Sequence, residues 1–192
     1  MLRRITLLAL LVAATVPAVA APQKYDIDKN HTYVTFNYDH FGFSKPTVTL
    51  DQVSGELQLD TADLTKSSVS VSLPLEGLHT HVPKLDDHLK SADFFDAAKY
   101  PEIAFKSSKV EKAGSDGFKI SGDLSLHGVT KPVVLNAKIN KIGENPMMKL
   151  ESAGFDAEVT IKRSDWGLDK YVPNVSDEIR IHISLDSHKA KS

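Results

Sequence analysis

Apolar and polar residues alternate along most of this chain, and the alternation limits the folds it can adopt. Alternate positions from 69 to 75 carry valine or leucine, and alternate positions from 179 to 185 carry isoleucine or leucine. Because successive side chains of a β-strand point to opposite faces, this period is typical of a strand with one buried face. The pattern predicts eight strands and a short additional one, at residues 31–38, 47–59, 67–75, 102–109, 117–126, 131–141, 150–162 and 177–186, with the short one at 24–28.

Strands that follow one another through short turns pair as antiparallel neighbours, so the sequence predicts an all-β fold. Eight such strands can hide their apolar faces by closing into a barrel or by stacking as a sandwich. The alternation leaves both open, although closure removes exposed sheet edges. One segment, VPKLDDHLKSADFFDAAKY, has apolar residues at helical spacing. We therefore expect one helical segment at about 82–100, lying across an opening of the sheet.

The first twenty residues have a different character from the rest of the chain. MLRRITLLALLVAATVPAVA combines a basic start, an apolar run and small residues at Ala18 and Ala20. This pattern is typical of a secretory signal peptide cleaved after Ala20. The apolar run is short for a membrane span, and no later stretch approaches that length. We expect residues 21–192 to form a single exported, soluble domain, most simply periplasmic, with no stable membrane span.

Composition excludes several classes of site. The 192 residues include no cysteine, which rules out disulfides, thiolate metal centres and a cysteine nucleophile. Charged residues of both signs are interspersed and the net charge is −2, so we expect no nucleic-acid partner. The chain has no GxGxxG, GxxxxGK[ST] or GxSxG motif, which leaves dinucleotide, P-loop and serine-hydrolase sites without support. No cofactor is expected.

The eight histidines raise the question of a metal site. His79 and His81 flank one threonine, and His88 follows close by with acidic neighbours. Zinc can bind two imidazoles and a carboxylate, but no HExxH motif is present and the spacing fixes no third ligand. A solvated loop with unrelated histidines is the favoured interpretation. Whether His79, His81 and His88 bind a metal stays open, and a histidine-metal enzyme is the least favoured function.

Two polar residues occupy alternate positions that, in the same strands, otherwise carry apolar side chains. His40 shares the parity of Val34 and Phe36, and Arg163 shares that of Ile161. An inward-facing charge is costly unless it is paired or solvated. Each residue therefore either lies beyond the strand end and turns to water, or contacts a polar head group at the mouth of an apolar cavity.

Several apolar and aromatic residues lie on the predicted inner face, in the helical segment or, for Trp166, just after the strand at 150–162. In a small barrel the inner face is at once the core and the wall of any ligand cavity, so both interpretations apply to these side chains. The predicted cavity residues are Val34, Phe36, Phe94, Phe95, Phe105 and Trp166.

Five stretches, in order along the chain, resemble the YceI-like family. They are YDIDKNHTYVTF with His40 following, LDDHLKSADFFDAAKYPEIAFKSS, ISGDLSLHGVTKPVVL, AGFDAEVTIKRSDWG and DEIRIHISL. The resemblance covers essentially all of residues 25–185. Two stretches differ from the usual pattern of the family, PTVTL at 46–50 and HTHVPK at 79–84.

The resemblance implies an eight-stranded antiparallel lipocalin-like β-barrel, which decides between barrel and sandwich. It also implies an exported protein, not an enzyme, that binds a long amphiphilic lipid, typically a polyisoprenoid, as a carrier or sequestering protein. We interpret His40 and Arg163 as its head-group contacts. A stress-related protein acting through its outer surface is the alternative. The identity of the lipid and the oligomeric state, including a homodimer, stay open.

The signal-peptide interpretation predicts the N-terminus of the mature protein. Cleavage after Ala20 leaves a chain that begins at Ala21. We expect N-terminal sequencing of protein recovered from an export-competent bacterial host to read APQKYD. A chain that retains Met1 in the same preparation contradicts this prediction.

Overall fold

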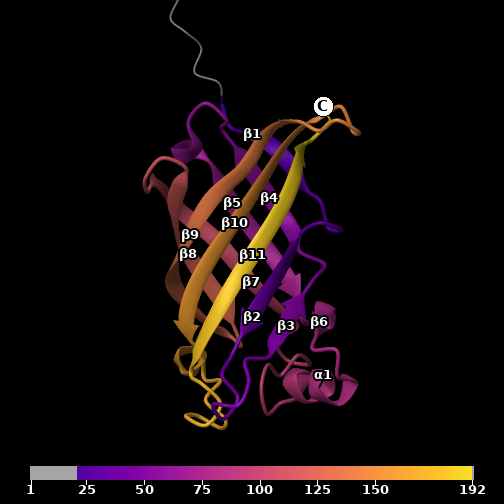
Figure 1. Ribbon diagram of the computed structural model, residues 1–192, viewed down its shortest axis with the longest axis vertical. Coiled ribbons are helices and arrows are strands. Elements are labelled where there is room, and N and C mark those ends of the chain that lie inside the picture. The colour runs from indigo at the N-terminus through magenta and orange to yellow at the C-terminus, as the bar shows by residue number, and fades with distance from the viewer. Residues whose placement is uncertain (1–20, 192) are drawn as a thin grey trace, which may run out of the picture.

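Antiparallel strands make up most of residues 21–191, which the computed structural model describes (Figure 1). The predicted signal peptide lies outside these described residues. No helix within them is both long and apolar enough to cross a bilayer. The strands are β1 (Gln23–Ile27), β2 (Tyr33–Asn37), β3 (Thr47–Leu50), β4 (Ser54–Leu59), β5 (Ser68–Pro74), β6 (Leu78–His79), β7 (Glu102–Lys112), β8 (Gly117–Leu126), β9 (Val129–Glu144), β10 (Glu151–Lys162) and β11 (Glu178–Lys189).

The sheet closes into a barrel because its last strand returns to its first. Around the ring the order is β1, β4, β5, β7, β8, β9, β10 and β11, and β11 pairs again with β1. Tyr25 lies opposite Lys189, and Ile27 lies opposite Ser187. The eight-stranded antiparallel barrel is thus confirmed and the sandwich is excluded. The short strand expected at 24–28 is the one that closes the ring.

Three strands of the barrel wall are each divided in two, into β1 and β2, β3 and β4, and β5 and β6. The alternation of residues does not predict these divisions. β1 pairs with one end of β11 and β2 with the other, where Val34 lies opposite Ile183. β3 and β6 then extend the sheet beside β2. The single strand expected at 47–59 is therefore two strands, β3 and β4. Between them Gln52 takes a left-handed φ of 60°, and the N–H of Asp51 donates to the carbonyl of Gly77 at 3.1 Å.

The helical segment is shorter than the expected 82–100. Helix α1 spans Pro83–Lys90, with proline at its first turn, where the missing N–H costs no hydrogen bond. The helix ends because the backbone of Ser91 is extended and its hydroxyl donates to the carbonyl of His88 at 2.7 Å. The following residues form turns that carry Phe94 and Phe95 toward the barrel. Figure 1 shows α1 at the end of the barrel opposite the chain termini.

Three short 3₁₀ turns connect strands at the two ends of the barrel, η1 (Leu64–Lys66), η2 (Leu75–Gly77) and η3 (Arg163–Trp166). Buried side chains gather near both ends. Tyr25, Leu57 and Leu59 pack at the end that holds the termini, and Val48 and Leu78 pack near α1. Between these clusters, inner side chains of the barrel wall are only half-buried, which shows that the interior is incompletely filled.

Candidate functional site: an apolar cavity inside the barrel

A cavity of about 490 Å³ runs along the inside of the barrel. Its wall extends from Leu64 and Ser68, near the chain termini, to Phe41 and Tyr171 at the end that holds α1. The wall consists mainly of valine, leucine, isoleucine and phenylalanine side chains, with few polar groups. Cavities of roughly 300–1,000 Å³ with this composition are typical of sites for small apolar molecules.

Five of the six predicted cavity residues lie on this wall. Val34 and Phe36 come from β2, Phe94 and Phe95 from the turn after α1, and Phe105 from β7. The rings of Phe36 and Phe95 meet edge to face with their centroids 6.3 Å apart, an arrangement that aromatic pairs favour. Contact of these five residues with a ligand stays a prediction. Val34, Phe36 and Phe105 lie where the period of two indicated, and Phe94 and Phe95 come from the helical segment.

Trp166 lies outside the cavity wall, contrary to the prediction. Its side chain is buried, and its Nε1 donates to the backbone carbonyl of Leu124 at 3.2 Å. The ammonium group of Lys131 lies 5.9 Å from the ring centroid. Trp166 lies beyond the end of β10 at Lys162, in the turn η3, so the period of two that marks inward-facing positions does not apply to it.

Arg163 also differs from both interpretations offered by the sequence. The residue is only 7% exposed, so it does not turn to water. Its guanidinium donates through Nε to Ser176, through Nη1 to Leu168, and through Nη2 to Lys170 and Val175, always to backbone carbonyls. Four of the five N–H groups of the fork are thereby used within the protein. Burial lowers the pKa of Arg163, with Asp177 and Asp169 opposing this, but an arginine keeps its charge.

The residues around Arg163 fix the same loop. The N–H and hydroxyl of Ser164 donate to the carboxylate of Asp177 at 2.9 and 2.8 Å. The carboxylate of Asp165, two residues along the chain from Arg163, lies 3.5 Å from the ammonium of Lys131. Arg163 therefore anchors the loop 168–177 at the barrel mouth, and its geometry does not favour a head-group contact.

His40 lies at the rim of the cavity and is exposed. Its backbone N–H donates to the carbonyl of Ser44 at 2.9 Å. Its ring packs edge to face against Phe41, with centroids 4.8 Å apart. A head-group contact for His40 is compatible with this position and stays a prediction.

Two loops contact each other at this mouth, and no sequence pattern predicts these contacts. Asp93, after α1, binds the ammonium of Lys170 at 2.5 Å. Phe94 packs against Tyr171 with ring centroids 6.1 Å apart. The hydrogen bond with Lys170 lowers the pKa of Asp93, and the same bond raises the pKa of Lys170. Tyr171 lies in a loop without periodicity, so no sequence signal places it on the cavity wall.

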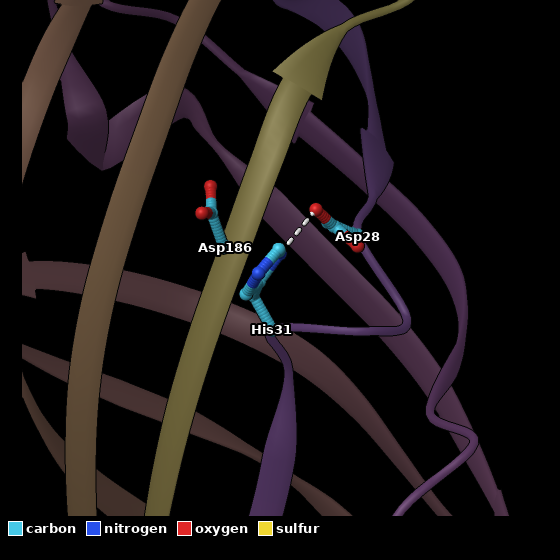
Figure 2. A group of neighbouring side chains, drawn as sticks. All are labelled: Asp28, His31 and Asp186. Atoms are coloured by element: carbon cyan, nitrogen blue, oxygen red, sulfur yellow. Dashed lines mark hydrogen bonds and ion pairs between the residues drawn. The ribbon is translucent and has the colours of Figure 1, made fainter. Parts of the chain in front are cut away.

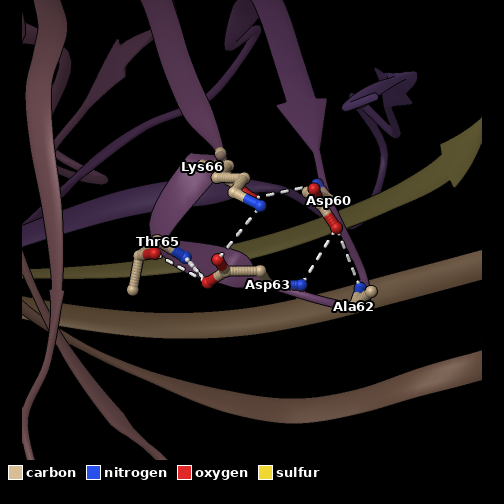
Figure 3. A network of polar contacts seen from close by, with 6 residues as sticks. Asp60, Ala62, Asp63, Thr65 and Lys66 are labelled. Atoms are coloured by element: carbon tan, nitrogen blue, oxygen red, sulfur yellow. Dashed lines mark hydrogen bonds and ion pairs between the residues drawn. The ribbon is translucent and has the colours of Figure 1, made fainter. Parts of the chain in front are cut away.

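The turn η1 contributes to the wall at the other end of the cavity, and polar contacts fix its backbone (Figure 3). Asp60 is buried, and its Oδ1 accepts hydrogen bonds from the backbone N–H groups of Ala62 and Asp63 at 3.0 and 2.9 Å. Oδ1 of Asp63 accepts in turn from the N–H of Thr65 at 3.2 Å. Side-chain acceptors of this kind fix tight turns. This turn carries Leu64 onto the cavity wall.

The three histidines considered for metal binding do not meet. Nε2 of His79 lies 3.5 Å from Oδ2 of Asp51, and Nε2 of His88 lies 3.7 Å from Oδ2 of Asp93. His81 is exposed with a left-handed backbone. Within residues 21–191 these three side chains form no common ligand group.

The YceI-like domain model matches residues 25–187, almost the whole of the predicted mature chain. The chain belongs to the YceI-like family. It is 37% identical over 174 residues to Protein YceI of Escherichia coli, covering 91% of this chain and 90% of that relative. It is 35% identical over 184 residues to Protein YceI of Salmonella arizonae, covering 96% of this chain and 95% of that relative.

Solved structures share the YceI-like barrel. The Campylobacter jejuni YCEI protein matches with a TM-score of 0.73 and 28% identity, over 80% of this chain and 90% of that one. BcnA of Burkholderia cenocepacia matches with a TM-score of 0.76 at 22% identity, over 84% and 99% of the two chains. A polyisoprenoid binding domain from Saccharophagus degradans matches with a TM-score of 0.66 at 16% identity, over 86% and 98%. The last two are similar to this YceI-like chain in fold.

The contacts of Arg163 predict a structural role that can be measured. Arg163→Ala leaves four carbonyls without their donor and should lower the free energy of unfolding by about 3 kcal/mol. Arg163→Lys keeps the charge but not the planar set of five N–H donors, so it should recover only part of the lost free energy of unfolding. Arg180→Ala, at an exposed position, is the matched control and should cost about 0.5 kcal/mol or less. Urea unfolding gives all three values, and equal losses for Arg163→Ala and Arg180→Ala contradict the assignment.

Proposed function

We propose that this protein holds the apolar chain of an uncharged long-chain lipid, of the polyisoprenoid type, inside its barrel. The proposal rests on the apolar character of the cavity wall. Among the wall residues that the structure describes, Arg163 is the only lysine or arginine, and its guanidinium donates to backbone carbonyls. Burying an apolar chain in such a cavity gains about 25 cal/mol per Å² before the cost of ordering it. The polyisoprenoid binding domain that shares this fold supports the choice of lipid.

The size of the cavity bears on how the lipid is held. A volume of about 490 Å³ lies within the range of roughly 300–1,000 Å³ that holds drug-sized ligands and is small for a polyisoprenoid of many units. A longer chain then continues through the mouth between Phe41 and Tyr171, or widens the barrel by displacing the half-buried wall. We further propose that the protein is exported and acts as a carrier or sequestering protein, because such a lipid needs a shield from water on its way between membranes.

A substitution in the middle of the cavity tests lipid binding directly. Val159 is a half-buried wall residue of β10, and Thr160 beside it is exposed. Val159→Trp fills the cavity and should weaken binding of geranylgeraniol at least tenfold. Thr160→Trp, the matched control, should bind like the unaltered protein. Affinity is measured by competition with a fluorescent fatty alcohol, and thermal unfolding checks that both variants are folded. Unchanged affinity in a folded Val159→Trp variant contradicts the proposal.

Because the guanidinium of Arg163 already donates to backbone carbonyls, we expect the protein not to prefer an anionic head group over an uncharged one. Geranylgeraniol and geranylgeranyl phosphate have the same chain and differ in charge. Because a phosphate loses hydration at the mouth without gaining a dedicated cation, the alcohol should bind at least as tightly as the phosphate. Tighter binding of the phosphate by tenfold or more would show that His40 or Arg163 contacts an anionic head group after all.

A further inference from the structure

Three metal-binding side chains meet on the outside of the barrel, away from the cavity. Asp28 and His31 lie in the connection between β1 and β2, and Asp186 lies on β11 (Figure 2). One ligand atom from each can be chosen so that all three lie within 4.8 Å of one another. Nδ1 of His31 and Oδ2 of Asp28 are 2.7 Å apart. No sequence motif marks this group, since 155 positions separate His31 from Asp186.

The backbone beneath these side chains is held firmly. The N–H of Asp28 donates to the carbonyl of Asp186 at 2.9 Å. The hydroxyl of Thr32 donates to the same carbonyl at 3.1 Å and accepts from the N–H of Asp186 at 3.0 Å. Thr32 is 1% exposed, so water does not compete for these bonds. The Cα positions of the three candidate ligands are therefore set by the barrel, and only side-chain rotations are needed to bring their ligand atoms together.

We propose that Asp28, His31 and Asp186 form a surface site for a divalent transition-metal cation of the zinc type. One imidazole and two carboxylates suit zinc, which takes nitrogen and oxygen ligands in tetrahedral sites. Calcium prefers six to eight oxygen ligands and magnesium an octahedral oxygen set, so an imidazole in the group points away from both. Because His31 is exposed, a water molecule can take the fourth coordination position of the zinc ion. His188, two positions beyond Asp186 on the same face of β11, is the nearest additional imidazole along that strand.

A metal at this place joins three segments where β11 pairs with both β1 and β2. Asp28 follows the end of β1, His31 precedes β2, and Asp186 belongs to the strand that pairs with both. A cation that binds the folded state only stabilises it by mass action. Zinc at about a hundred times its Kd should therefore raise the melting temperature of a domain of this size by roughly 5–10 °C.

Calorimetric titration with zinc chloride tests the site. The purified protein, freed of metal with EDTA and dialysed, should bind one zinc ion with a Kd in the micromolar range. His31→Ala and Asp186→Asn should each weaken binding at least tenfold. His182→Ala is the matched control, because His182 is also on β11 but lies outside the proposed site, with its Nδ1 3.6 Å from Oε1 of Glu158. This control should bind zinc like the unaltered protein.

The melting temperature in EDTA and in zinc separates binding from folding. His31→Ala and Asp186→Asn should melt near the unaltered protein in EDTA and lose most of the rise that zinc produces. Calcium chloride at the same concentration should produce no rise. If both variants bind zinc with unaltered affinity, or if the unaltered protein binds none at millimolar zinc, the proposal is wrong and the group is only a hydrogen-bonded strand junction.

Discussion

The pairing of β11 with two different partners is the constraint on which the structure depends. One half of this strand continues the sheet through β2, and the other half returns it to β1. Without the second pairing, β1 and β11 are open edges, which invite association with other chains. With it, every strand of the ring has two neighbours, and the alternate apolar side chains of the ring face a common interior. Tyr25, 1% exposed, lies within that closing pairing.

Closure creates an interior, but the side chains do not fill it. Phe105 and Phe118 are buried in one half of the barrel, whereas Val71 and Val133 between the clusters are half-buried. Protein cores normally pack as densely as organic crystals, and wall atoms beside a void lose dispersion contacts. The barrel tolerates this because its backbone ladder, together with the clusters at the two ends, holds the wall in place. The same incomplete packing is what makes room for a ligand.

The alternation of residues predicted most of the fold, because a one-residue shift would turn every apolar side chain of a strand to solvent. It placed Val34, Phe36 and Phe105 on the inner wall correctly. It failed where the chain leaves the strand geometry. At Gln52 a left-handed residue divides a strand, and after Lys162 the turn η3 places Trp166 off the cavity wall. Contacts between distant segments, such as Asp93 with Lys170, depend on register and loop geometry, which periodicity does not contain.

The unfilled interior gives the empty and the loaded protein different lifetimes. Any cargo that enters the cavity binds the folded chain and not the unfolded one, so it shifts the folding equilibrium toward the native state. Proteolysis commonly proceeds through transiently opened chains, and its rate then follows their population. On the proposed function, the lipid-free barrel is the form with the larger unfolded population, so proteolysis should remove it first and the abundance of the protein should follow the supply of the lipid.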